Sequence, residues 1–231
     1  MSGTFAKVVV PDQPTPLDSR GYPGWVPLAQ ITSSVPPPAA TVATVVSRTA
    51  WLHGDDAAGA RAIEASFGTR LPVLGSVDAL VRVGLPGGRV LRVSKSEVSV
   101  TRRGDPALPA EGPELVRSAT MFVGLPYLWA GTSGFGFDCS GLTSLVHRVH
   151  GVTIPRDAAP QAVAGGAVRG DAPRAGDLLF YAADGEVHHV SMYAGGGLMV
   201  HAPRTGLTVE TIPVKTASFA SEFSGARRFV S

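Results

Sequence analysis

Residues 134–146 read GFGFDCSGLTSLV, and Cys139 within this stretch is the only cysteine in the 231-residue chain. After it, apolar residues recur at the spacing i, i+3, i+4 and i+7, which is typical of an amphipathic helix. These residues are Leu142, Leu145, Val146 and Val149. The pattern predicts a helix that begins at about Cys139 and ends at Gly151.

This start places the Cys139 sulfur at a helix N-terminus, where free N–H groups and the helix dipole favour an anion. We therefore expect a depressed thiol pKa and a nucleophilic thiolate. Asp138 is expected to cap the first turn, and Gly141 to leave room near the sulfur. A lone cysteine is in general more often a small buried apolar side chain. The polar neighbours Asp138 and Ser140, together with the helix start, favour the nucleophile here.

A cysteine nucleophile needs a base, and a group that orients the base. Residues 187–203 read VHHVSMYAGGGLMVHAP and predict two antiparallel strands. A three-residue turn at residues 194–196 would make His189 and His201 direct cross-strand neighbours, about 5 Å apart at Cβ, with His188 on the other face. A two-residue turn would break this register unless a β-bulge restored it.

A zinc site built from Cys139, His189 and His201 is the alternative for the same side chains. The chain contains no C-x-x-C or H-E-x-x-H spacing, which such sites commonly use. We therefore expect no metal and no other cofactor.

The remaining chain falls into segments of different texture. Residues 1–35 are rich in turns, and the three prolines at 36–38 predict an extended connector. Residues 40–103 carry short strands at close spacing, with a hairpin signal in ALVRVGLPGGRVLRV at 79–93, and predict a small all-β barrel of the SH3 type. Residues 113–231 pass from helical to strand-like patterns, so we expect an α+β domain.

Composition excludes several classes of partner. The formal net charge is +2 with dispersed basic residues, so we expect no nucleic-acid partner. No apolar run is long enough for a membrane span, and the N-terminus does not resemble a secretory signal. A cytoplasmic location is favoured, with a cell-wall or extracellular one if the N-terminus is truncated. The sequence does not indicate an oligomeric state.

Four stretches resemble, in order and spacing, the NlpC/P60 peptidases, which are bacterial cysteine hydrolases of cell-wall peptides with a papain-like core. They are GLPYLWAGTSGFGFDCSGLTSLV, IPRDAAPQ, RAGDLLFY and HHVSMYAGGGLMVHAP. The resemblance covers residues 113–231 and implies a papain-like catalytic domain there. The segments before it resemble the bacterial SH3-like modules of one subgroup, of which residues 1–35 would form an incomplete first copy.

The resemblance implies roles for individual residues. Cys139 matches the family nucleophile, His189 the base and His201 the third polar residue of a Cys-His-His triad. Tyr127 matches a tyrosine beside the nucleophile that donates to the oxyanion.

It also implies contacts with substrate. Asp138 and Ser140 match residues that help to recognise the free amino end of the peptide. Arg156 and Asp157 match the start of the family's R-D-S or R-T-S motif, in which Ala158 stands in place of serine here.

The implied activity is cleavage of cell-wall peptides at the γ-D-glutamyl–diamino acid bond through a thioester, as in enzymes of the dipeptidyl-peptidase VI type. Two alternatives stay open at this point. One is an amidase or acyltransferase on the same scaffold, and the other is a non-catalytic protein that binds wall peptides.

Overall fold

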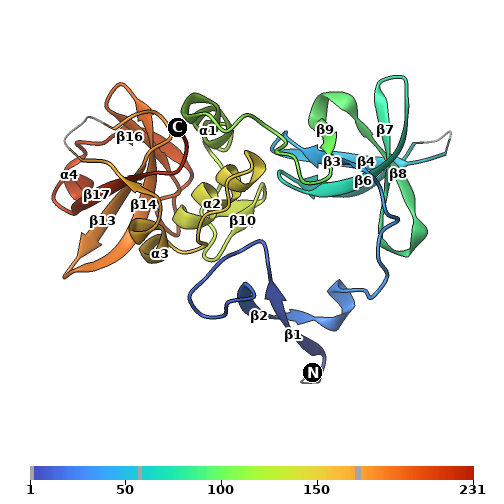
Figure 1. Cartoon of the computed structure of the whole chain (residues 1–231), viewed down its shortest axis with the longest axis horizontal. Helices are drawn as coiled ribbons and strands as arrows, with labels where there is room; N and C mark the ends of the chain where they lie inside the picture. Colours follow the sequence, from blue (N-terminus) through green and yellow to red (C-terminus); the bar gives the residue numbers. More distant parts are fainter. Residues whose placement is uncertain (1–2, 57–58, 170–172) are drawn as a thin grey trace. The chain divides into compact units, whose positions relative to one another are not determined.

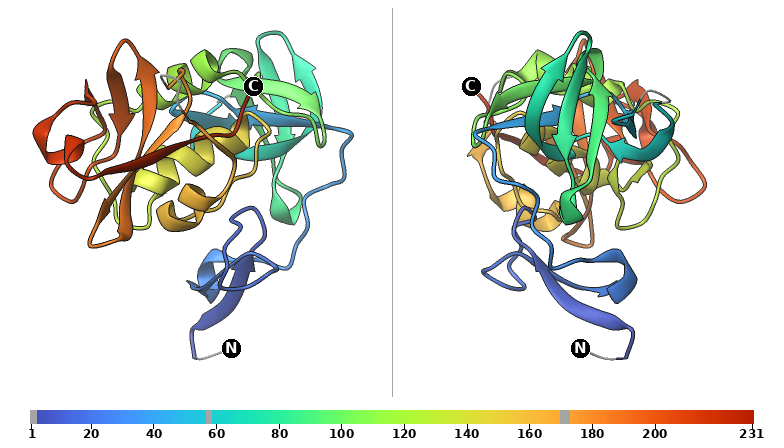
Figure 2. Two further views of the ribbon diagram at one scale, coloured as in Figure 1. Left: turned by 60° about the vertical axis from the view of Figure 1, so that its left-hand side comes forward. Right: turned by 90° about the vertical axis from the view of Figure 1, so that its right-hand side faces the viewer.

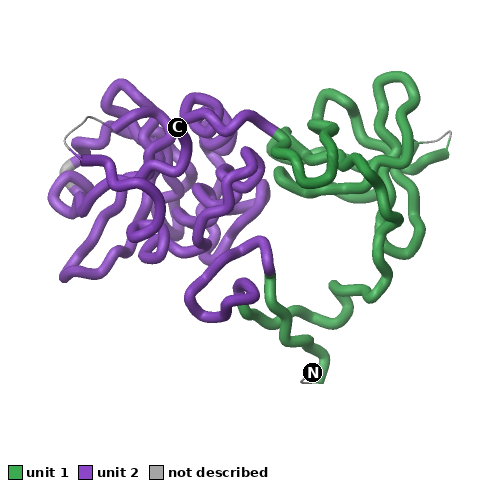
Figure 3. Tube along the Cα trace, viewed as in Figure 1, with its two compact units in different colours: residues 1–10, 23–107 green, residues 11–22, 108–231 purple. Residues whose placement is uncertain are grey.

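The computed structural model describes residues 3–56, 59–169 and 173–231. The chain forms two compact units, coloured separately in Figure 3. The first comprises residues 1–10 and 23–107, and the second comprises residues 11–22 and 108–231. No helix in the described ranges is long and apolar enough to cross a membrane.

The first unit is built from strands, with three short 3-10 turns (Figure 1). At its N-terminal end, β1 (Phe5–Val10) and β2 (Tyr22–Pro27) form a two-stranded sheet, and η1 (Leu28–Gln30) follows. Seven further strands form one sheet in the order β5-β4-β8-β7-β6-β3-β9. In chain order these are β3 (Thr41–Val45), β4 (Thr49–Gly54), β5 (Arg61–Ser66), β6 (Arg70–Val77), β7 (Leu80–Gly84), β8 (Val90–Ser94) and β9 (Val98–Arg102), with turns η2 (Pro86–Gly88) and η3 (Lys95–Glu97).

Alternation along these strands produces the core of the seven-stranded sheet. Val81, Val83, Leu91 and Val93 point inward from β7 and β8 and are almost fully buried. The predicted hairpin is confirmed, because β7 pairs with β8 and Gly87 and Gly88 adopt positive φ angles in the connection.

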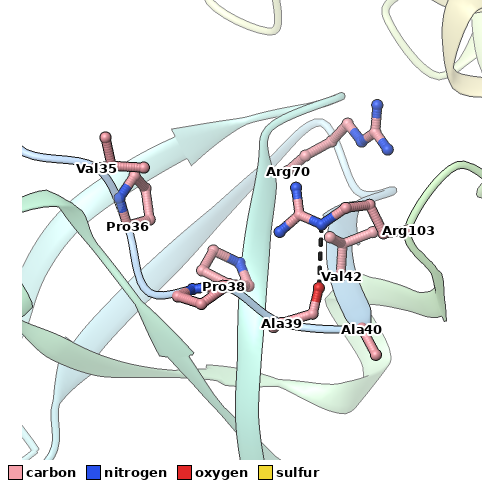
Figure 4. A pocket seen from close by; sticks show the side chains of 9 residues that line it. Val35, Pro36, Pro38, Ala39, Ala40, Val42, Arg70 and Arg103 are labelled. Atoms are coloured by element: carbon pink, nitrogen blue, oxygen red, sulfur yellow. Dashed lines mark hydrogen bonds between the residues drawn. The ribbon is translucent and has the colours of Figure 1, made fainter.

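A pocket of about 730 Å³ lies in the first unit, beside the proline-rich connector (Figure 4). Arg103 Nε donates a hydrogen bond to the Ala39 carbonyl at its edge, at 3.0 Å. The lining is Val35, Pro36, Pro38, Ala39, Ala40, Val42, Arg70, Pro72 and Arg103. It includes no thiol, histidine or carboxylate, so this pocket offers no nucleophile or base.

The second unit combines helices with a six-stranded antiparallel sheet in the order β12-β17-β13-β14-β15-β16. Its helices are α1 (Gly112–Thr120), α2 (Cys139–Val149), α3 (Ala158–Val163) and α4 (Ala217–Ala220). Its sheet strands are β12 (Gly166–Ala167), β13 (Leu178–Ala183), β14 (Glu186–Gly195), β15 (Leu198–His201), β16 (Glu210–Pro213) and β17 (Phe223–Arg228), and β10 (Thr132–Ser133) pairs with β11 (Gly136–Phe137). Helices α1, α2 and α3 all contact β14.

Helix α2 begins and ends where the sequence predicted. The Asp138 carboxylate caps it by accepting the Gly141 N–H at 2.6 Å, and Gly151 follows its end with a φ of 80°. The apolar stripe is buried as expected, with Leu142, Leu145 and Val146 at most 2% exposed.

Gly141 serves a different purpose from the one expected. A Cβ atom at this position would lie 2.0 Å from the Gly131 carbonyl oxygen, well inside van der Waals contact. Glycine therefore allows the first turn of α2 to lie directly against the chain that precedes β10.

Candidate active site

Cys139 is the first residue of α2 and is 9% exposed. The backbone N–H groups of Ser140 and Val190 point toward its sulfur. Nevertheless, burial and then the Asp138 carboxylate raise the pKa of the Cys139 thiol above its ordinary value. The predicted depression of this pKa is therefore wrong, because desolvation outweighs the helix N-terminus. At neutral pH Cys139 is therefore a thiol, which could act as a nucleophile only with a base to remove its proton.

The histidine pair that could supply this base is present, but in a different register from the one predicted. Strands β14 and β15 are joined at Gly196 and Gly197, and a bulge near Ala194 shifts the pairing to Tyr193 opposite Met199. The predicted pairing of residue 189 with 201 is wrong by two residues. A shift of two keeps every side chain on its face, so His189 and His201 still share one face.

His189 Nε2 lies 2.8 Å from His201 Nδ1, and the ring centroids are 5.0 Å apart. This hydrogen bond engages Nε2 of His189, so Nδ1 is the ring nitrogen that is not bonded to His201. Burial, followed by the neighbouring His201 and His188, lowers the pKa of His189 to about 3. The imidazole is therefore neutral near pH 7 and able to accept a proton.

The ring of Phe219, from the short helix α4, covers both imidazoles. Its centroid lies 5.3 Å from that of His189 and 5.0 Å from that of His201. The sequence analysis missed this residue, because nothing in the pattern around residues 217–220 indicates a contact with β14 and β15.

Tyr127 lies between α1 and β10 and forms an isolated parallel bridge with Phe137. Burial, followed by the charges of Cys139 and Asp138, raises the pKa of its hydroxyl to about 12. The influence of Cys139 indicates that the two side chains are near each other. At neutral pH the hydroxyl keeps its proton and can donate a hydrogen bond.

Asp138, Ser140 and Arg156 form one buried network directly under the sulfur. Arg156 donates to Asp138 Oδ2 at 2.7 Å, to Asp138 Oδ1 at 3.0 Å and to Ser140 Oγ at 3.0 Å. All three residues are less than 9% exposed. Their polar groups are thus engaged with one another and with the helix start.

Asp157 differs from its neighbour, because its side chain is 40% exposed and lies 3.9 Å from the Arg156 guanidinium. The hydroxyl of Tyr22 donates a hydrogen bond to Asp157. Burial, and then the Asp157 carboxylate, raise the pKa of Tyr22. The sequence analysis did not select Tyr22, which is 135 positions from Asp157 in the chain. In the structure the preceding residue, Gly21, adopts a φ of 131°.

The segment 11–22 that delivers Tyr22 belongs to the second unit. The Pro14 carbonyl accepts the backbone N–H of Arg156 at 2.9 Å, and Asp12 lies 3.8 Å from Arg148 on α2. The loop between β1 and β2 is therefore part of the same compact unit as Cys139.

Comparison with known proteins agrees with this geometry. The NlpC/P60 family model matches residues 124–228, and the YKFC SH3b2 domain model matches residues 45–100. Over 99% of its length the chain is 42% identical to a gamma-D-glutamyl-L-lysine dipeptidyl-peptidase of Bacillus cereus, of which it covers 70%. A Bacillus subtilis protein of the same name is 36% identical, with 98% of this chain and 75% of the relative covered.

The chain belongs to the NlpC/P60 family.

A crystal structure of an NlpC/P60 family protein from Bacillus cereus has the same fold, with a TM-score of 0.92 and 39% identity. The match covers the whole of this chain and 78% of that one. The predicted fold class, an α+β papain-like domain preceded by SH3-like modules, is confirmed. The chain is a cysteine peptidase of the NlpC/P60 family, whose members hydrolyse bacterial cell-wall peptides.

Three further histidines of this NlpC/P60 chain lie away from the sulfur. His147 is fully buried within α2, and its Nδ1 donates to the Thr143 carbonyl at 2.8 Å. His150 contacts Ser118, and His188 is on the other face of β14, 3.2 Å from Glu222. Among the histidines that the structure describes, only His189 and His201 are hydrogen-bonded to each other.

Proposed function

We propose that this peptidase cleaves the γ-D-glutamyl–diamino acid bond of cell-wall-derived peptides, with Cys139 as nucleophile, His189 as base and His201 as orienting residue. The observation that carries the proposal is the hydrogen-bonded His189–His201 pair, together with the backbone N–H of the next residue, Val190, which points toward the sulfur of the buried Cys139 at a helix start. A relative named for the γ-D-glutamyl-L-lysine bond, 42% identical over nearly the whole chain, supports the choice of bond.

The reaction begins from a thiol and a neutral imidazole. His189 Nδ1 takes the proton from Cys139 as the sulfur attacks the amide carbon. The thiolate therefore forms during the attack and is not present in the resting enzyme. The carbonyl oxygen becomes an oxyanion. It accepts hydrogen bonds from the Cys139 backbone N–H, which as the first of the helix has no partner four residues earlier, and from the Tyr127 hydroxyl.

The tetrahedral intermediate collapses when the C–N bond breaks. The imidazolium of His189 gives its proton to the leaving amine, and the diamino acid departs. Water then attacks the thioester, with His189 taking one of its protons and returning it to the sulfur. The products are a dipeptide with a free carboxylate and the regenerated thiol.

We propose that Asp157 and Tyr22 bind the free amino end of the substrate. Asp157 has a carboxylate that is both exposed and hydrogen-bonded, whereas the Asp138 carboxylate is occupied by Arg156 and Gly141. Asp138, Ser140 and Arg156 would then have a structural role, in which their hydrogen bonds hold the start of α2 in place. This proposal differs from the family resemblance, which implied that Asp138 and Ser140 help to recognise the free amino end.

The proposed domain division is a partial SH3-like module at residues 1–35, an SH3-like module at residues 40–103 and the catalytic domain at residues 113–231. Within the first module, the loop at residues 11–22 contacts Arg148 and Arg156. These contacts support a role for this loop as one wall of the substrate site.

Mass spectrometry of L-Ala-γ-D-Glu-L-Lys, incubated with the wild type or with Cys139→Ala, tests the proposal. We expect L-Ala-D-Glu and free lysine from the wild type alone, and the diaminopimelate peptide run in parallel ranks the two diamino acids. An intact peptide in both samples under reducing conditions would contradict the assignment and favour the wall-binding alternative. A product carrying an added amine would instead identify an acyltransferase.

A further inference from the structure

Glu210 is the first residue of β16 and lies directly opposite His201 in the β15–β16 ladder. Its Oε1 atom is 3.3 Å from His201 Nε2. Strands β14, β15 and β16 are neighbours in the sheet (Figure 1). The pairing therefore places a carboxylate beside Nε2 of His201, while Nδ1 of the same ring is hydrogen-bonded to His189.

Few groups can interact with Nε2 of His201. The side chain is fully buried, and Nε2 is shielded from solvent and makes no well-directed hydrogen bond within the described residues. The contact with Glu210 is thus mainly electrostatic, and Glu210 is the charged group that faces this nitrogen. Burial lowers the pKa of His201, while the Glu210 carboxylate opposes that shift.

Proton counting shows why a carboxylate at this position matters. Two neutral imidazoles share one proton in the His189 Nε2–His201 Nδ1 hydrogen bond. If His189 donates, its Nδ1 is a bare lone pair, and the proton of His201 is on Nε2, facing Glu210. If His201 donates, the proton of His189 is on Nδ1, and a bare Nε2 of His201 faces the carboxylate.

Only the first arrangement makes His189 a base toward the thiol. A carboxylate accepts hydrogen bonds and repels a lone pair, so it stabilises the first arrangement and destabilises the second. We propose that Glu210 is a positioning residue that selects the proton arrangement in which His189 can deprotonate Cys139. This inference rests on the proposed roles of His189 and Cys139.

The matched control is Glu222. Its Oε2 lies 3.2 Å from His188 Nε2, and the exposed fractions of the two glutamate side chains are 42% for Glu210 and 37% for Glu222. His188 is on the opposite face from His189. Glu222→Gln therefore removes another glutamate–histidine pair without changing a contact of His201 or Glu210.

The experiment compares Glu210→Gln, Glu210→Leu and Glu222→Gln with the wild type. We expect kcat to fall about 10-fold in Glu210→Gln, whose amide oxygen keeps a partial negative charge facing Nε2, and about 10²-fold in Glu210→Leu, within the usual range for loss of a positioned base. KM and the melting temperature should change little. Glu222→Gln should match the wild type.

A second readout is independent of activity. Nitrogen-15 NMR of the histidine rings should show the His189 proton on Nε2 in the wild type and a substantial share on Nδ1 in Glu210→Leu. If the tautomer of His189 and kcat are both unchanged in Glu210→Leu, the inference is wrong. If the wild type is inactive on the peptide, the proposed substrate fails, but the tautomer measurement still decides the role of Glu210.

Discussion

Asp138 and Arg156 form a buried, two-pronged ion pair one residue before Cys139, with nitrogen–oxygen distances of 2.7 and 3.0 Å. The same carboxylate caps α2 through Gly141, so one side chain holds both the helix start and the arginine. The guanidinium lowers the pKa of the Cys139 thiol, against the effect of Asp138. The ion pair therefore stabilises the site, and the positive charge of Arg156 partly offsets the effect of the Asp138 carboxylate on the thiol.

Removal of Arg156 should destabilise the second unit strongly. Arg156→Ala leaves the Asp138 carboxylate buried without its partner, which typically costs about 3–5 kcal/mol in the free energy of unfolding. Urea unfolding followed by circular dichroism measures this loss. The control is Arg117→Ala, which breaks an exposed pair with Glu114 on α1 and should change stability by less than about 1 kcal/mol. Equal effects of the two substitutions would show that the buried pair has no special weight.

Tyr127→Phe should lower kcat by about 10²–10³ and leave KM nearly unchanged, because it removes one oxyanion donor and little else. Steady-state kinetics on the tripeptide measures both constants. Tyr193→Phe is a suitable control, since the Tyr193 hydroxyl accepts the Gly197 N–H in the turn after β14 and should not affect the reaction. A Tyr127→Phe enzyme with wild-type kcat would exclude the hydroxyl from oxyanion stabilisation.

Asp157→Asn should raise KM for the free tripeptide by about 10-fold or more, as expected for loss of a hydrogen bond between charged groups. It should not affect the weak cleavage of an N-acetylated tripeptide, which carries no amino charge. Asp12→Asn changes an exposed carboxylate in the loop at residues 11–22, which also carries Tyr22, and serves as the control. A similar loss on both peptides would mean that Asp157 acts through structure and not through the amine.

Acidification should destabilise the protein through its buried histidines. Burial lowers the pKa of His147 to about 4, from an ordinary value of 6.5. Between these values the unfolded chain binds a proton that the folded chain does not. The free energy of unfolding therefore falls as the pH drops from 6.5 to 4, by up to about 3 kcal/mol from this residue alone.

Urea unfolding at several pH values between 4 and 7 measures this dependence. His147→Gln retains a donor for the Thr143 carbonyl but does not titrate, so its slope in this range should be smaller by about one proton. Identical slopes for the wild type and His147→Gln would show that His147 does not contribute.

The sequence predicted features that depend on local periodicity. The start of α2 and its Asp138 cap follow from neighbouring residues, and the shared face of His189 and His201 follows from the alternation of strands. The predicted register failed because the turn has two residues, at 196–197, and not three at 194–196; the bulge near Ala194 then made the total shift an even number of residues. The face survived because the shift was even.

Features that depend on contacts distant in sequence were not predicted. The direction of the Cys139 pKa shift depends on how deeply the sulfur is buried, which a helix-terminus argument does not contain. Tyr22 and Phe219 reach the site from segments far from it in the chain, and their roles follow only from the tertiary fold. Glu210 became visible only when the β15–β16 pairing placed it opposite His201.

Because of the loop at residues 11–22, the N-terminal module and the catalytic domain of this enzyme cannot be exchanged independently of each other. A catalytic fragment cut at residue 108 would leave behind the Pro14 carbonyl that receives the Arg156 N–H, and the Tyr22 hydroxyl that meets Asp157. Under the proposed role of Tyr22 and Asp157 in binding the amino end, exchange of the N-terminal module between relatives would transfer part of the substrate selectivity with it. Over evolution, the two segments are expected to be inherited as a pair.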